Sequence, residues 1–146
     1  MTEWTQQQRR RLRGGMAVLA LTPALVGIWA SVSPRGFYDD FPGSGSHWVS
    51  AVGPYDEHLV RDVGALYLGA LVLLVLAWVW LDRRLVQAAL ISYAVAALPH
   101  LIYHATALEG FSTGDAVAEI GGLALNVFLP IGLLFLTRTR TQAVTR

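Results

Sequence analysis

The sequence predicts an all-α integral membrane protein, an antiparallel four-helix bundle with an extracytoplasmic loop between its first two helices. Of the 146 residues, 54% are hydrophobic and only 14% are charged, and the mean hydropathy is +0.47. A soluble domain carries about 25% charged residues. The apolar residues fall in four blocks, each near the roughly 20 residues that a helix needs to cross a bilayer core about 30 Å thick. A chain of this length is one membrane domain.

The four apolar blocks predict helices at 14–32, 58–81, 85–108 and 115–137. The first block follows a run of arginines and ends in small residues, which is also the pattern of a cleaved signal peptide. Its apolar stretch, 16–32, has 17 residues, whereas the apolar region of a signal peptide has about 7–15. A membrane helix is therefore the favoured interpretation, with a signal peptide as the alternative.

The long connection at 33–57 contains three prolines and several glycines, which argue against one continuous helix or strand. It also carries Phe37, Tyr38, Phe41 and Trp48, which make it too apolar for a free linker. We expect an ordered outer segment. Its aromatic side chains either cover the mouth of the bundle as a lid or form a belt at the level of the lipid headgroups.

The placement of arginine predicts the orientation. All eleven basic residues are arginines, and nine of them flank the chain ends or the tight turn at 82–84. The other side holds eight of the ten acids and all four histidines. The positive-inside rule then puts both termini in the cytoplasm of a bacterial cell, with the basic N-terminus against anionic lipid. No basic surface with interleaved aromatics is present, so nucleic-acid binding is not expected.

Three helix ends near the outer face each carry two polar side chains at i, i+4 spacing: His58 and Asp62, His100 and His104, and Asp115 and Glu119. Side chains at this spacing share a helix face and lie about 6 Å apart along the axis. A charge inside hydrocarbon costs at least ~2.5–3.5 kcal/mol, so these groups are expected to turn inward and meet. Further along the same helices, Asn126, Tyr67 and Tyr93 extend the polar positions inward.

Imidazole and carboxylate groups are ligands of divalent transition metals such as Zn, Fe, Mn and Cu. Helix bundles build such sites from ligands on several helices. The expected metal ligands are His58, Asp62, His100, His104 and Glu119. In this hypothesis Asp62 and Glu119 also act as catalytic proton acceptors, and Arg61 orients an anionic group. The protein would be a membrane metalloenzyme acting on a lipid-soluble substrate.

Two alternatives use the same residues. In the first, they form only hydrogen bonds and ion pairs, with Arg61 bound to Glu119 or Asp62. The chain is then an accessory subunit or ligand-binding module of a larger membrane protein. The HxxxH spacing alone is a weak metal signal, and acids at helix N-termini are favoured by the helix dipole. In the second, a haem lies between His58 and either His100 or His104.

Four segments, SPRGFYDDFPG, HWV, GPYDEHLVRDVG and PHLIYH, resemble a group of small four-helix integral membrane proteins of high-GC Gram-positive bacteria. The likeness covers most of the chain. It implies four membrane helices and carries no established activity, so it assigns no role to any residue.

Overall fold

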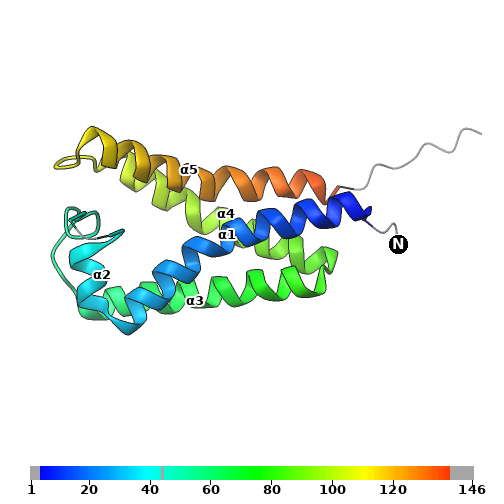
Figure 1. Cartoon of the computed structure of the whole chain (residues 1–146), viewed down its shortest axis with the longest axis horizontal. Coiled ribbons are helices and arrows are strands. Elements are labelled where there is room, and N and C mark those ends of the chain that lie inside the picture. Colours follow the sequence, from blue (N-terminus) through cyan, green and yellow to red (C-terminus); the bar gives the residue numbers. More distant parts are fainter. Residues whose placement is uncertain (1–3, 44, 139–146) are drawn as a thin grey trace, which may run out of the picture.

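The structure, a computed structural model, describes residues 4–43 and 45–138. Within these ranges it contains five helices: α1 (Gln6–Val32), α2 (Pro34–Asp40), α3 (Glu57–Trp80), α4 (Arg83–Thr106) and α5 (Thr113–Leu136) (Figure 1). Four of them, all except α2, are long and apolar enough to cross a membrane. The predicted all-helical class and the predicted number of helices that are long and apolar enough to cross a membrane are therefore confirmed.

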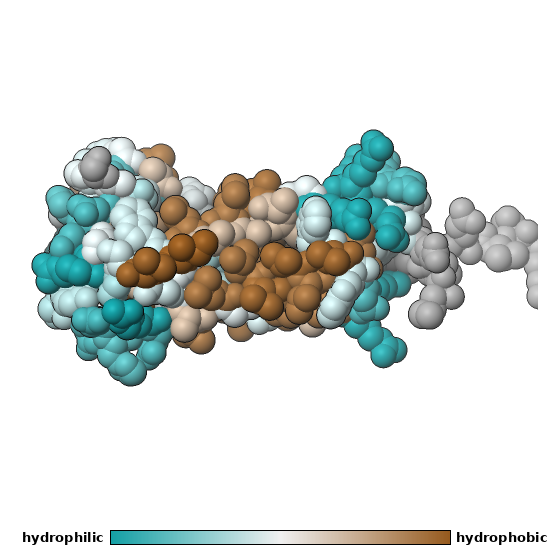
Figure 2. Space-filling model, turned by 60° about the horizontal axis from the view of Figure 1, so that its bottom comes forward, coloured by the Kyte–Doolittle hydropathy of each residue, from teal (hydrophilic) through white to brown (hydrophobic). Residues whose placement is uncertain are grey.

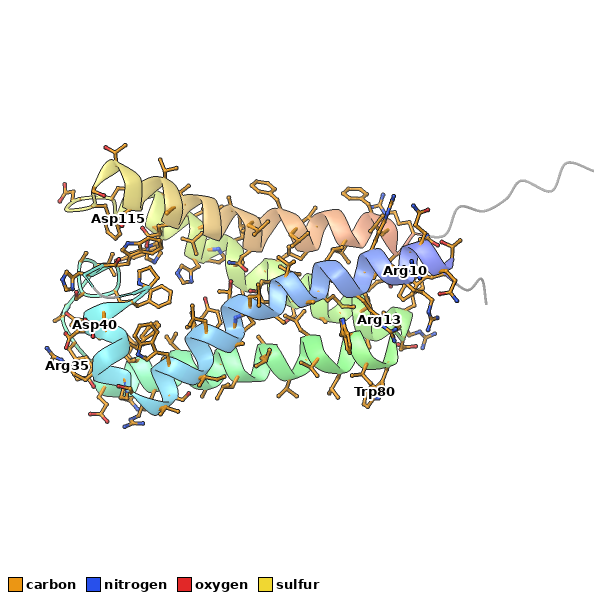
Figure 3. All side chains as sticks on the ribbon, in the orientation of Figure 1. Arg10, Arg13, Arg35, Asp40, Trp80 and Asp115 are labelled. Carbon is orange, nitrogen blue, oxygen red and sulfur yellow. The ribbon has the colours of Figure 1, made fainter. Side chains whose placement is uncertain are left out.

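The four long helices form two pairs, because α1 packs mainly against α3 and α4 packs mainly against α5. In Figure 1 successive long helices run in opposite directions along the long axis. The start of α1, the end of α5 and the turn between α3 and α4 lie at one end, and α2 lies at the other. Figure 3 places Arg10 and Arg13 at the first end, and Arg35, Asp40 and Asp115 at the second.

The surface between these two ends is apolar. Figure 2 shows a broad hydrophobic band flanked by hydrophilic ends. In the most apolar window of each long helix only 17% to 33% of the residues are buried. Most apolar side chains therefore face outward, as expected for a protein solvated by lipid tails.

Two clusters of buried residues hold the helices together. The larger, around Leu12, Leu74, Leu90 and Leu133, joins all four long helices near the arginine-rich end. The smaller, built from Val26, Ala30, Phe37 and Val60, joins only α1, α2 and α3 at the opposite end. Because α4 and α5 contribute nothing to the smaller cluster, the two helix pairs leave space between them at this end.

The first helix begins at Gln6, about two turns earlier than predicted. Thr5 caps it by accepting a hydrogen bond from the Gln8 backbone, and the Gln8 side chain accepts from the backbone of Thr5. Such a reciprocal cap allows a helix to start in a polar segment. The arginine run therefore belongs to α1. The other three long helices begin and end within two residues of their predicted bounds.

The predicted loop at 33–57 contains a short helix, α2, that the sequence analysis did not anticipate. Pro34 starts it, since its fixed φ suits the first helical position. Rings then follow one another from Trp29 to Phe37 (centroids 6.1 Å apart), Phe41 (4.9 Å) and Trp48 (6.2 Å). These aromatic contacts hold together a segment that we call the aromatic cap (residues 34–43 and 45–52).

Candidate functional site

At the end of the molecule that carries the aromatic cap, α4 and α5 bring a histidine and a carboxylate together. His104 Nδ1 lies 2.7 Å from Glu119 Oε1, and these side chains are only 13% and 5% exposed. The nitrogen approaches the oxygen without the alignment of a regular hydrogen bond. The second oxygen, Glu119 Oε2, is buried and has no hydrogen-bond partner among the described residues. Glu119 is thus a buried acid with unused hydrogen-bonding capacity.

His100 lies one turn before His104 on α4, and their rings stack with centroids 4.7 Å apart and planes 27° apart. The hydroxyl of Tyr67, from α3, lies 3.4 Å from His100 Nδ1. Side chains of α3, α4 and α5, two of them from α4, therefore form a single polar group of four residues: Tyr67, His100, His104 and Glu119. We call this group the polar site.

The polar site lies in the wall of a cavity of about 320 Å³. Phe37, Phe41 and Trp48 of the aromatic cap line the same cavity. Trp48 Nε1 donates a hydrogen bond to Asp115 Oδ1 (3.0 Å), which ties the cap to the first turn of α5. Ser112 caps that helix, its hydroxyl accepting from the Asp115 backbone (3.1 Å). The cap therefore covers the cavity, as the lid interpretation of this segment requires.

A second cavity, of about 450 Å³, lies between α3, α4 and α5, closer to the middle of the helices. It shares five lining residues with the first: Val63, Tyr67, His100, Leu123 and Asn126. The two cavities therefore adjoin at these residues. Below this junction the Tyr93 hydroxyl donates to Asn126 Oδ1 (2.8 Å), and Asn126 Nδ2 donates to Thr22 Oγ1 (3.3 Å).

Three of the predicted site residues lie elsewhere. His58 Nε2 is 3.3 Å from Asp62 Oδ2, but these side chains are 88% and 57% exposed and line neither cavity. Arg61 pairs with Glu57 (2.8 Å) and donates to the Ser31 carbonyl (3.0 Å). The ion-pair alternative expected it to bind Glu119 or Asp62, and it contacts neither. A haem held between them would require His58 to face His100 or His104, and it does not.

The structure thus brings together His100, His104 and Glu119 from the five predicted metal ligands. Among the residues it describes, no group of three or more His, Cys, Asp or Glu side chains is close enough to hold a metal ion. The predicted five-residue cluster does not form. The physical reason is the rotation of α3, whose buried face carries Val60 and Gly64, so that the face bearing His58 and Asp62 points away.

Two contacts of the site were not predicted from the sequence. Thr22, which contacts Asn126, carries a hydroxyl within an apolar helix, and this isolated polar group is a signal that could have identified it. Trp48 gave no such signal, because its partner Asp115 lies 67 residues away and the pairing depends on how the cap folds. The predicted inward extension through Tyr67, Tyr93 and Asn126 is present.

No protein family, curated protein or solved structure matches the chain. The chemistry of the site follows from its lining. Apolar side chains dominate both cavities, and the polar groups are one carboxyl, two imidazoles, an indole, an amide and hydroxyls. None of the described arginines lines either cavity, and the chain has no lysine. Such a site can donate and accept hydrogen bonds from one end of a largely apolar molecule.

Proposed function

We propose that the protein binds a lipid-soluble molecule within the membrane and holds its polar end at Glu119 and His104. The observation that carries this proposal is the unpartnered Oε2 of Glu119 in the wall of a largely apolar cavity. A buried polar atom without a partner costs about 1–3 kcal/mol. A ligand that donates a hydrogen bond to this oxygen removes that cost on binding. Ligand binding therefore gives a reason for a buried carboxyl at Glu119, whose Oε2 takes part in no hydrogen bond that stabilises the described fold.

The volume supports the same proposal. Cavities that bind small molecules are about 300–1,000 Å³, mostly apolar, and carry a few polar groups that fix the orientation of the ligand. The cavity under the aromatic cap is about 320 Å³ and has this composition. The ligand's polar end lies at the polar site, and its apolar part contacts apolar lining residues such as Val63 and Leu123.

Photolabelling tests the proposal. The protein is placed in phosphatidylcholine nanodiscs with 1-tetradecanol that carries a diazirine beside the hydroxyl, and labelled peptides are measured by mass spectrometry. We expect labelling of cavity-lining peptides in the wild type, and a loss of about tenfold or more in Glu119→Leu, because a hydrogen bond to a charged group contributes about 1.5–3 kcal/mol. Glu109→Leu, an exposed acid outside the cavity, is the matched control.

Elution of both variants at the wild-type volume in size-exclusion chromatography shows that they are folded. If Glu119→Leu labels the cavity peptides as strongly as the wild type and the Glu109→Leu control, the proposal is wrong.

The arginine-rich end is proposed to be cytoplasmic and the cavity end extracytoplasmic, in the cell membrane of a bacterium. The charges at the two ends support this orientation through the positive-inside rule. Because the chain has no cysteine, Gln7→Cys and Ala51→Cys can each be labelled without background. A membrane-impermeant maleimide on intact cells should label Ala51→Cys alone. Labelling of Gln7→Cys alone would reverse the orientation.

A divalent transition metal (Zn, Fe, Mn or Cu) is the second candidate for the polar site. The 2.7 Å approach of His104 to Glu119 favours it, because imidazole and carboxylate are ligand types such metals prefer. Among the described residues these two would be the protein ligands, since no third His, Cys, Asp or Glu completes the group. Elemental analysis of the wild type beside a His100→Ala/His104→Ala variant tests it. A stoichiometric metal that the variant loses supports this function. An equal, near-zero content in both rejects it.

A further inference from the structure

The cavity between α3, α4 and α5 opens sideways. Half of its lining residues on α3 and α4 are small: Gly69, Ala70, Ala89, Ser92, Ala96 and Ala97. Gly69 and Ala96 are exposed, and both lie near the middle of their helices. The opening therefore faces the apolar band of the protein rather than either polar end. We call this cavity the lateral groove.

The lateral groove leads directly to the polar site. It shares Tyr67, His100 and Asn126 with the cavity under the aromatic cap, so the two spaces adjoin at these side chains. Along α4, the eight steps from Ala96 to His104 span about 12 Å. An extended chain advances about 1.2 Å per bond, so roughly ten bonds cover this distance. A linear chain of this length therefore reaches from Ala96 to the turn of α4 whose His104 contacts Glu119.

We infer that the ligand is a long-chain alcohol, with its hydroxyl at Glu119 Oε2 and its hydrocarbon chain in the lateral groove, which it enters from the bilayer between α3 and α4. This inference rests on the proposed function and specifies the class of molecule bound. The chain needs no passage through water, because the groove opens where lipid tails lie.

The head group is a hydroxyl rather than a carboxylate because of the charges around it. Among the described residues, the two cavities are lined by one acid, Glu119, and by no arginine, and the chain has no lysine. The arginine on α3, Arg61, is already paired with Glu57 and the Ser31 carbonyl. A carboxylate would meet Glu119 without a compensating cation and would leave Oε2 without a donor. A hydroxyl donates to Oε2 and accepts from an imidazole.

Chain length and head group are tested together. Photoreactive 1-butanol, 1-tetradecanol and tetradecanoic acid, each with a diazirine beside the head group, are compared at equal mole fraction in phosphatidylcholine nanodiscs. We expect the wild type to label about fivefold more strongly with tetradecanol than with butanol. The ratio is modest because the bilayer already solvates the chain, and only packing in the groove favours the longer probe. The acid should label at least about fivefold less than tetradecanol.

Ala96→Phe fills the groove, and Ala65→Phe is its control, an exposed alanine on α3 that lines neither cavity. Ala96→Phe should lower tetradecanol labelling about fivefold, to the butanol level, and leave butanol labelling unchanged. Ala65→Phe should change neither. Gly69→Leu provides a second obstruction if Ala96→Phe does not fold, since a Cβ at Gly69 meets nothing within 4 Å. Its control is Gly121→Leu, which is open in the same way and lines neither cavity.

The outcomes separate the two proposals. If Glu119→Leu lowers labelling by both alcohols but Ala96→Phe and Gly69→Leu lower neither, the groove does not hold the chain and the polar site still binds a ligand. Labelling by the acid that equals the alcohol overturns the head-group assignment. If Ala96→Phe instead dissociates an oligomer or a co-purifying membrane protein, a helix occupies the groove and the inference is wrong. If Glu119→Leu changes nothing, the proposed function itself fails.

Discussion

The close approach of α1 and α3 at Gly64 makes a sharp prediction about stability. A Cβ added at Gly64 would lie 2.6 Å from Ser31 Oγ, 2.9 Å from Ser31 N and 3.2 Å from the Ala30 carbonyl carbon. The hydroxyl can rotate away, but the other two atoms are backbone. Gly64→Ala must therefore move the helices apart. Gly69→Ala, five residues further along α3, is the matched control, because its Cβ would meet nothing within 4 Å.

The magnitude follows from two opposing terms. Alanine in place of glycine inside a helix gains about 0.5–1 kcal/mol, and this term applies to both variants. Overpacking costs about 1–3 kcal/mol and applies only at Gly64. Gly69→Ala should therefore stabilise the protein, and Gly64→Ala should lower its free energy of unfolding by up to about 2 kcal/mol. The difference between the variants, about 1–3 kcal/mol, isolates the packing cost.

Each purified variant is unfolded in the same detergent, once with a denaturant and once with heat. Circular dichroism of the helices monitors both transitions. Gly64→Ala should unfold at a lower denaturant concentration and temperature than the wild type, and Gly69→Ala at higher values. The spacing of α1 and α3 would not be as described if both variants were stabilised equally. Ser31→Ala/Gly64→Ala provides a further check, because removing the hydroxyl relieves only the 2.6 Å contact and should restore only part of the loss.

Three further predictions concern side chains. Trp48→Phe removes the hydrogen bond to Asp115 (3.0 Å) and should cost about 1–2 kcal/mol in thermal unfolding and increase hydrogen exchange in the aromatic cap. Asp62→Ala should change the free energy of unfolding by less than about 0.5 kcal/mol, because its pair with a histidine is exposed. Tyr93→Phe should cost about 1 kcal/mol in the same assay, since it leaves Asn126 Oδ1 without the 2.8 Å donor inside the protein.

The long helices could be predicted because their signal is local. Four apolar stretches of membrane-crossing length determine four helices whatever surrounds them. The errors lie where polar segments are stabilised by specific partners. The arginine run continues α1 because Thr5 and Gln8 cap it, and because Leu12 is buried in the larger core cluster. The short helix α2 depends on the packing of Phe37 against Trp29, which the composition of the loop does not reveal.

The candidate site could be predicted only in part, because hydropathy does not determine how an apolar helix is rotated about its axis. On α5, Asn126 follows Glu119 by seven residues, so the two share a face, and both line the cavity. On α4, Tyr93 and His100 are related in the same way, and both line the lateral groove. These two helices present their polar residues inward as expected. The third, α3, is apolar on every face beyond Tyr67, so the rest of the helix did not show in which direction its polar pair points.

The rotation of α3 is set by its smallest interior residue. Gly64 allows α3 to contact the backbone of Ser31 on α1, and this contact fixes which face of α3 is buried. His58 and Asp62 precede Val60 and Gly64 by two residues, about 200° around the helix axis, so they point outward. Tyr67, three residues beyond Gly64, is brought to His100 instead. The same close approach that excludes an imidazole and a carboxylate from the site therefore supplies it with a hydroxyl, and leaves Glu119 as its only acid.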